Sequence, residues 1–114
     1  MDDLVNLFKA LTDETRFRII NLLLKRELCV CELVEILDMS QPRLSRHLNI
    51  LKQTGILQSW REGKWMHYAI KKELSTYCKT VLNGVGEKLS QDKTGKLDLQ
   101  KVKKVSRKPG KACC

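Results

Sequence analysis

The stretch SQPRLSRHLNILKQTGIL, residues 40–57, decides the fold of this chain. Ser40 is a residue type that caps a helix N-terminus, and Gly55 is suited to the position just after a helix C-terminus. Between them, apolar side chains recur at spacings of four and three residues, which places them on one helix face: Leu44, Leu48 and Leu51. The stretch therefore predicts an amphipathic helix with a buried leucine face and a separate outward face.

The outward side of this helix offers the chemical groups that contact DNA. Amide, hydroxyl, guanidinium and ammonium groups bind base edges and phosphates, and they belong to Gln41, Arg43, Ser45, Arg46, His47, Asn49 and Lys52. A solvated helix surface can carry the same residues, so the helix needs support from its neighbours.

Those neighbours complete a known DNA-binding arrangement. A shorter helix is predicted over residues 29–37, and a brief turn joins it to the helix from residue 40. After Gly55 the apolar period changes to two, in residues 56–60 and 65–70, which predicts a β-hairpin turning near Glu62 with Arg61 and Lys64 beside the turn. The predicted fold is mainly α with a β-hairpin, a winged helix-turn-helix, with double-stranded operator DNA as partner.

The remaining helices predict a dimer. Residues 4–11, a second helix capped by Thr12, and residues 71–89 all carry apolar stripes. These stripes exceed what so small a chain covers alone, so we expect a homodimer through the first and last helices. We expect a sensor and DNA-binding domain over residues 1–89, and a basic, disordered tail over residues 90–114 that ends in Cys113 and Cys114.

Charge supports a polyanionic partner. The formal net charge is +9. Residues 41–68 hold five basic side chains and one acidic side chain, and residues 90–114 hold eight and two. Such clustering favours nucleic acid. No apolar run approaches the roughly 20 residues of a membrane span, and no secretory signal is visible, so we expect no membrane partner and a cytoplasmic location, where thiols stay reduced.

Two thiols lie at the start of the helix that precedes residue 40, in ELCVCEL, residues 27–33. Cys29 and Glu32 have the spacing of a capping box. A helix N-terminus lowers a thiol pKa, and thiolates bind soft ions. A relaxed helix does not aim residues two positions apart at one point, so joint coordination by Cys29 and Cys31 should distort the first turn. Alternatively, both are small buried residues, since free cysteine is often buried.

The chain resembles the ArsR/SmtB family of metal-responsive bacterial repressors over residues 4–89. The resemblance is carried by ALTDETRFRIINLL (10–23), ELCVCEL (27–33), SQPRLSRHLNILKQTGIL (40–57) and REGKWMHYAI (61–70). ELCVCEL is similar to the metal box of the arsenite-responsive branch. The resemblance implies that Cys29 and Cys31 bind As(III) or Sb(III) as inducer, and that Gln41, Arg43, Ser45 and Arg46 lie on the recognition helix.

The chain departs from that branch at Val34, where a third cysteine is frequent. Candidates for a third ligand are Cys78, Cys113 and Cys114, a thiol of the partner chain, or an external thiol or water. Cys78 lies on the apolar side of the helix over residues 71–89, which favours packing. Neither His47 nor His67 has the paired carboxylate–histidine spacing of zinc-sensing relatives.

Two other functions stay open at this point. The same repressor could sense cadmium, lead, or oxidation or persulfidation of Cys29 and Cys31. A protein of another class could use the thiols to buffer metal or for redox work. No acid–base or phosphate-binding constellation is present in the sequence, so we expect neither an enzyme nor an organic cofactor.

Overall fold

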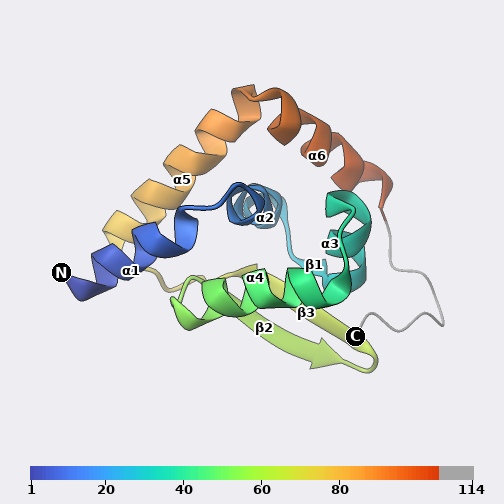
Figure 1. Cartoon of the computed structure of the whole chain (residues 1–114), viewed down its shortest axis with the longest axis horizontal. Coiled ribbons are helices and arrows are strands. Elements are labelled where there is room, and N and C mark those ends of the chain that lie inside the picture. Colours follow the sequence, from blue (N-terminus) through green and yellow to red (C-terminus); the bar gives the residue numbers. More distant parts are fainter. Residues whose placement is uncertain (106–114) are drawn as a thin grey trace.

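The computed structural model describes residues 1–105 of the chain. In chain order the elements are α1 (Asp2–Leu11), α2 (Glu14–Lys25), β1 (Leu28–Cys29), α3 (Val30–Leu37), α4 (Gln41–Gln53), β2 (Leu57–Glu62), β3 (Trp65–Ile70), α5 (Thr76–Gln91) and α6 (Lys93–Lys104). The helix α4 and the hairpin of β2 and β3 lie along one side of the molecule (Figure 1). The helices α5 and α6 arch over the opposite side, with α2 between the two layers.

The core forms where α2 meets the helices of the DNA-binding unit. Ile19, Ile20 and Leu22 of α2 are fully buried, and so are the three leucines predicted for the inner face of α4, which are Leu44, Leu48 and Leu51. Burial of each leucine contributes about 1.5–3 kcal/mol relative to an exposed side chain. This core fixes α4 from its inner side and leaves its outer side in solvent. None of the helices within residues 1–105 is long and apolar enough to cross a membrane.

Local signals position the ends of α2 and α4. Ser40 caps α4 as expected, since its hydroxyl accepts a hydrogen bond from the Arg43 N–H at 3.4 Å. Gly55 follows α4 with φ of +87°, a conformation that favours glycine. The predicted N-cap of α2, Thr12, is wrong by one residue. Asp13 caps α2 by accepting from the Arg16 N–H at 3.1 Å, whereas Thr12 closes α1.

The sheet has one strand more than the predicted hairpin. The hairpin is confirmed, with β2 and β3 antiparallel and Trp60 opposite His67. The short strand β1 adds to the other edge of β3, so the order is β1-β3-β2, and Cys29 also lies opposite His67. A two-residue strand has too few positions to show a period of two. Its pairing nevertheless sets the backbone of Cys29.

Residues 93–104 contradict the expectation of a disordered tail over residues 90–114, because they form α6. The helix α5 begins at Thr76, later than expected, and continues past Gly86 to Gln91. Asp92 caps α6 by accepting from two backbone N–H groups. Gly95 is required at this corner, since a Cβ there would lie 2.0 Å from the Leu89 carbonyl oxygen. The rest of the expected tail, residues 106–114, lies outside the described residues.

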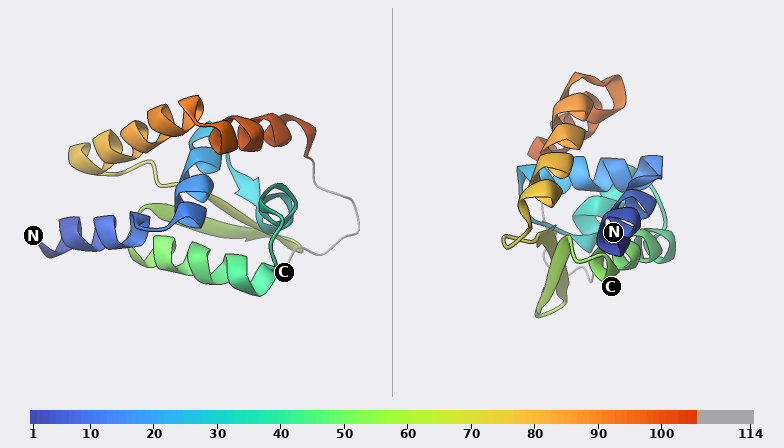
Figure 2. Two further views of the ribbon diagram at one scale, coloured as in Figure 1. Left: turned by 45° about the horizontal axis from the view of Figure 1, so that its top comes forward. Right: turned by 90° about the vertical axis from the view of Figure 1, so that its left-hand side faces the viewer.

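The packing of α6 explains why a lysine-rich segment is helical. Arg18 of α2 donates two hydrogen bonds to the Asp98 carboxylate, at 2.8 and 2.9 Å, and Asp98 is 1% exposed. Val102 is buried against the core. The helix therefore turns the chain back across α2 towards α3, as Figure 2 also shows.

Candidate DNA interface and thiol site

Five of the seven side chains predicted for the outer face of α4 are exposed, and the prediction is wrong for His47. Side chains exposed on this helix include Arg43, Ser45, Arg46, Asn49 and Lys52, while Gln41 is half-buried. The exposed guanidinium and amide groups can donate to base edges or phosphates. No charged side chain of the outer face is held in an ion pair within residues 1–105. The face is therefore available to a polyanion.

His47 points away from that face. Its Nδ1 lies 3.1 Å from Arg16 Nη1 and 4.0 Å from an Asp13 carboxylate oxygen, and the side chain is 15% exposed. Burial lowers the pKa of His47, the Asp13 carboxylate opposes this, and the charges of Arg16, Arg43 and Arg46 reinforce it. His47 therefore joins α4 to α2, which makes it a poorer DNA contact than its neighbours.

The hairpin carries cations at its tip and an aromatic stack midway along its strands. Arg61 and Lys64 are exposed on either side of Gly63, whose φ is +59°. The Trp60 ring stacks on His67 with centroids 5.4 Å apart and planes 12° apart. The Trp60 Nε1–H donates to Glu62 at 2.9 Å. These contacts stabilise the pairing of the two strands, and the hairpin lies beside α4 (Figure 1).

The two cysteines of ELCVCEL converge. Their Sγ atoms are 3.2 Å apart. Cys29 is the N-cap of α3 and has an extended backbone, φ −88° and ψ 164°, because it also belongs to β1. Cys31 lies in the first turn of α3. Contrary to the expectation from the sequence, joint coordination need not distort a helical turn, since only one of the two residues is helical.

The surroundings of Cys29 are polar but buried. The predicted capping box is present: the Cys29 N–H donates to Glu32 Oε1 at 2.9 Å, and Glu32 is 2% exposed. The second Glu32 oxygen accepts from Arg26 at 3.2 Å. Burial raises the pKa of the Cys29 thiol, against the partial opposition of the Glu32 backbone N–H. This reverses the expected effect of the helix N-terminus. Binding of a metal ion at Cys29 must therefore release a proton near neutral pH.

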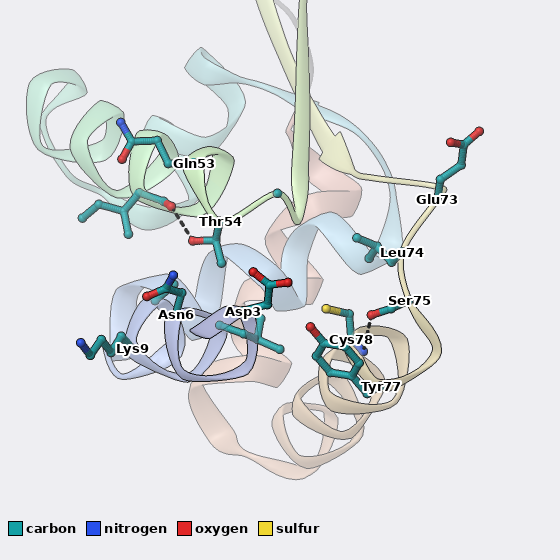
Figure 3. Close-up of a pocket in the computed structure, with 14 residues that line it drawn as sticks. Asp3, Asn6, Lys9, Gln53, Thr54, Glu73, Leu74, Ser75, Tyr77 and Cys78 are labelled. Carbon is teal, nitrogen blue, oxygen red and sulfur yellow. Dashed lines mark hydrogen bonds between the residues drawn. The ribbon is translucent and has the colours of Figure 1, made fainter. Parts of the chain in front are cut away.

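Within residues 1–105, no three Cys, His, Asp or Glu side chains are grouped so that they could hold a metal ion. Cys78 lies in the first turn of α5, at the end of the molecule opposite α3 (Figures 1 and 2). It lines a surface pocket of about 650 Å³ between α1 and α5, with Tyr77 and Asp3 beside it (Figure 3). The structure therefore separates Cys78 from the cysteine pair. Cys113 and Cys114 lie outside the described residues.

The outer sides of α1 and α5 form an apolar surface. Leu4, Val5 and Phe8 of α1 are 40%, 41% and 51% exposed, and Tyr77 of α5 is 43% exposed. Leu7 is 1% exposed and belongs to the core. An apolar surface shared by the first helix and α5 fits the predicted dimer contact.

Comparison with known proteins shows which family has this arrangement. The family described as "Bacterial regulatory protein, arsR family" matches residues 13–59, from the cap of α2 into β2. The "Arsenical resistance operon repressor" of Escherichia coli (strain K12) is 42% identical over 80 residues, which cover 69% of this chain and 68% of that protein. The chain belongs to the ArsR family. It is a DNA-binding transcriptional regulator of that family, with a winged helix-turn-helix fold.

Other relatives are named for resistance to different elements, arsenic in one case and cadmium in another. The "Arsenic resistance transcriptional regulator ArsR1" of Pseudomonas putida is 44% identical over 79 residues, which cover 68% of this chain and 62% of that protein. The "Cadmium resistance transcriptional regulatory protein CadC" of Listeria innocua is 45% identical over 65 residues, 56% of this chain and 55% of that protein. This chain therefore matches only part of the length of these relatives.

Solved ArsR-family structures share the fold. HlyU from Vibrio cholerae has a TM-score of 0.68 at 32% identity, covering 75% of this chain and 90% of that chain. Mb0332 from Mycobacterium bovis, described as a homodimeric winged helix-turn-helix DNA-binding domain, has a TM-score of 0.64 at 26% identity, covering 81% of this chain and 86% of that chain.

Proposed function

We propose that this ArsR-family protein is a homodimeric repressor that leaves its operator when As(III) or Sb(III) binds Cys29 and Cys31. The observation that carries the proposal is the 3.2 Å separation of the two Sγ atoms. Metal–sulfur bonds of about 2.3 Å allow two sulfurs of one ion to lie up to about 4.6 Å apart. The pair therefore meets this requirement without a large movement, and thiolate sulfur is the ligand that soft ions prefer.

The position of the pair connects it to both DNA-contacting elements. Cys29 ends β1, whose partner strand β3 belongs to the hairpin, and it directly precedes α3, which contacts α4. An ion that bridges Cys29 and Cys31 ties the end of β1 to the first turn of α3. A change in the position of Cys29 would therefore be passed both to the hairpin, through β1, and to α4, through α3.

The test measures release from DNA. The wild-type protein, Cys29→Ser, Cys31→Ser and the control Cys78→Ser are each bound to DNA from upstream of the protein's own gene, and arsenite is added. Serine is a competent N-cap but a poor ligand for a soft ion. We expect all four proteins to bind DNA, and only the wild type and Cys78→Ser to be released. Release of Cys29→Ser at the wild-type arsenite concentration would refute the proposal.

A cadmium-sensing repressor is the second candidate. It is favoured by the relative named as a cadmium resistance regulator, and the same thiol pair would serve a cadmium or lead ion. Titration of the operator complex with Cd²⁺ and arsenite separates the two candidates by the concentration at which each releases DNA. Oxidation or persulfidation of the pair would instead add a covalent mass change that remains after chelation.

The dimer proposal rests on the apolar surface of α1 and α5 and on the homodimeric Mb0332 domain. Phe8→Glu places a charge at the most exposed aromatic side chain of that surface without touching the core. We expect this variant to sediment as a monomer and to lose affinity for a two-half-site operator. A wild-type protein that is monomeric at micromolar concentration would contradict the proposal.

A further inference from the structure

The helix α6 is anchored to α2 by buried polar contacts as well as by apolar packing. Arg18 holds the buried Asp98 carboxylate through two hydrogen bonds. The Asn21 side-chain amide, which is 3% exposed, donates to the Gly95 carbonyl oxygen at 3.4 Å. Val102 is 8% exposed and belongs to the core. Because buried polar groups are costly to leave unpaired, these contacts give α6 one preferred position on α2.

The last turn of α3 is completed by a side chain of α6. The final carbonyl groups of a helix have no partner within the helix, and a cation beside them is favourable. The sequence of α3 has no basic residue in its last turn. Instead, Lys101 of α6 donates to the Ile36 carbonyl oxygen at 3.4 Å. A residue 65 positions further along the chain thus supplies the cation that the end of α3 lacks.

The first turn of α3 is linked to α6 through Arg26. The Arg26 Nη2 group donates to a Glu32 carboxylate oxygen at 3.2 Å and to the Val102 carbonyl oxygen at 3.3 Å. Glu32 belongs to the first turn of α3 and is 2% exposed. Val102 is next to Lys101 near the end of α6. Both ends of α3 are therefore joined to the C-terminal part of α6.

The position of α3 in turn affects the position of α4. Only residues 38–40 separate the two helices, and the helices are in contact. So short a connection leaves α4 little freedom relative to α3. A shift at the Ile36 end of α3 would therefore displace the start of α4, where Arg43 and Arg46 are exposed. Hydrogen bonds to base edges require side chains that are held within about 0.5 Å of the right geometry.

We infer that α6 is a positioning element of the DNA-binding unit, and that Lys101 fixes the orientation of α3 and hence of α4 on the operator. Lys101 acts through α3 and does not touch DNA itself, because α6 lies on the side of the molecule opposite α4 and the hairpin (Figure 1). The inference rests on α4 as the helix that contacts the operator, and it is independent of the inducer. It gives a role to a helix that lies outside the family match, which ends at residue 59.

The test compares binding to the operator with binding to unrelated DNA of the same length, each over a range of salt concentrations. Lys101→Met removes the ammonium group and keeps a long apolar side chain, whereas Lys101→Arg keeps a donor. We expect Lys101→Met to bind the operator at least about five-fold more weakly, the factor that corresponds to one hydrogen bond. Its affinity for unrelated DNA and its salt slope should be unchanged, and Lys101→Arg should bind as the wild type does.

Lys103→Met is the matched control. It removes the same charge from the same helix, but Lys103 is exposed and lines a groove with Lys25 rather than the cavity at α3. We expect this variant to bind both DNAs as the wild type does. Equal operator affinity of Lys101→Met and Lys103→Met would overturn the inference. A loss for both DNAs with a shallower salt slope would also overturn it, since Lys101 would then contact a phosphate.

Two further variants separate the inference from the assignment on which it rests. Asp98→Ala frees α6 from Arg18, and well below its thermal midpoint it should show the same loss of preference for the operator. An unchanged preference in Asp98→Ala would contradict a positioning role for α6. Arg43→Ala reports on α4 itself. If Arg43→Ala loses operator affinity and Lys101→Met does not, the inference alone fails. If Arg43→Ala binds the operator as the wild type does, the assignment of α4 fails and the inference fails with it.

Discussion

The Sγ atoms of Cys29 and Cys31 lie 3.2 Å apart because the two residues have different backbone conformations. Cys29 is extended and pairs with His67 across the sheet, while Cys31 is in the first turn of α3. A short strand running directly into a helix therefore brings together two side chains that a continuous helix would keep apart. Ion sensing by the cysteine pair, as proposed, depends on that junction.

Exposed arginines on α4 should determine operator affinity. Arg43→Ala or Arg46→Ala is expected to weaken operator binding by about 1–3 kcal/mol, because a guanidinium can donate two hydrogen bonds to a guanine edge. Fluorescence anisotropy measures the change. Lys96→Ala, which removes a cation from α6, is the matched control. Unchanged affinity in both arginine variants would rule out α4 as the recognition helix.

Lys64 at the hairpin tip should act differently. A lysine that contacts a phosphate releases a counterion, so Lys64→Ala should weaken binding to all DNA sequences alike. The slope of log K against log salt should become shallower by about one unit. Equal salt slopes for Lys64→Ala and the wild type would indicate that the hairpin tip does not touch the DNA backbone.

The Arg18–Asp98 pair should stabilise the docked position of α6. Asp98→Ala removes two charge-assisted hydrogen bonds and is expected to lower the free energy of unfolding by about 2 kcal/mol. Urea denaturation provides the measurement. Asp92→Ala, which removes the exposed cap of the same helix, should cost about 1 kcal/mol. If Asp98→Ala has no effect, α6 does not pack on α2 in solution.

His47 should make stability depend on pH. Burial holds its pKa below the ordinary 6.5 in the folded protein. As pH falls through 6.5, the unfolded chain takes up a proton that the folded protein resists, so this contribution to stability is present above 6.5 and is lost below it. His47→Gln should flatten the fall in the free energy of unfolding between pH 7 and 5. The same slope in both proteins would contradict the assignment.

The parts of the fold that sequence predicted depend on local signals. The leucine face of α4, the cap at Ser40 and the glycine after the helix each follow from residues within one segment. The capping box at Cys29 and Glu32 is also local, and it is present. The period of two on both sides of the turn near Glu62 predicted the hairpin for the same reason.

The parts that sequence missed depend on contacts between distant residues. The strand β1 is defined only by its pairing with β3, and its extended backbone reverses the expectation for the cysteine pair. The helix α6 has few apolar side chains, and the buried Arg18–Asp98 pair joins residues 80 positions apart. Two local features of this segment are typical of a helix. Asp92 is a residue type that caps a helix N-terminus, and Leu99 and Val102 have the three-residue spacing of one helix face. Burial of the Cys29 thiol is likewise a property of the packed structure.

Coupling between arsenite binding and operator binding distinguishes a sensor from a protein that merely holds arsenic. If arsenite at the Cys29–Cys31 pair weakens operator binding about 100-fold, a coupling of about 2.7 kcal/mol, then operator must weaken arsenite binding by the same factor. Calorimetric titration of arsenite into the free protein and into the operator complex measures the arsenite affinity of each. We predict that arsenite binds the operator complex of the wild type about 100-fold more weakly than the free protein, and that Cys31→Ser shows no coupling. Equal arsenite affinity of the free and the operator-bound wild type would contradict it.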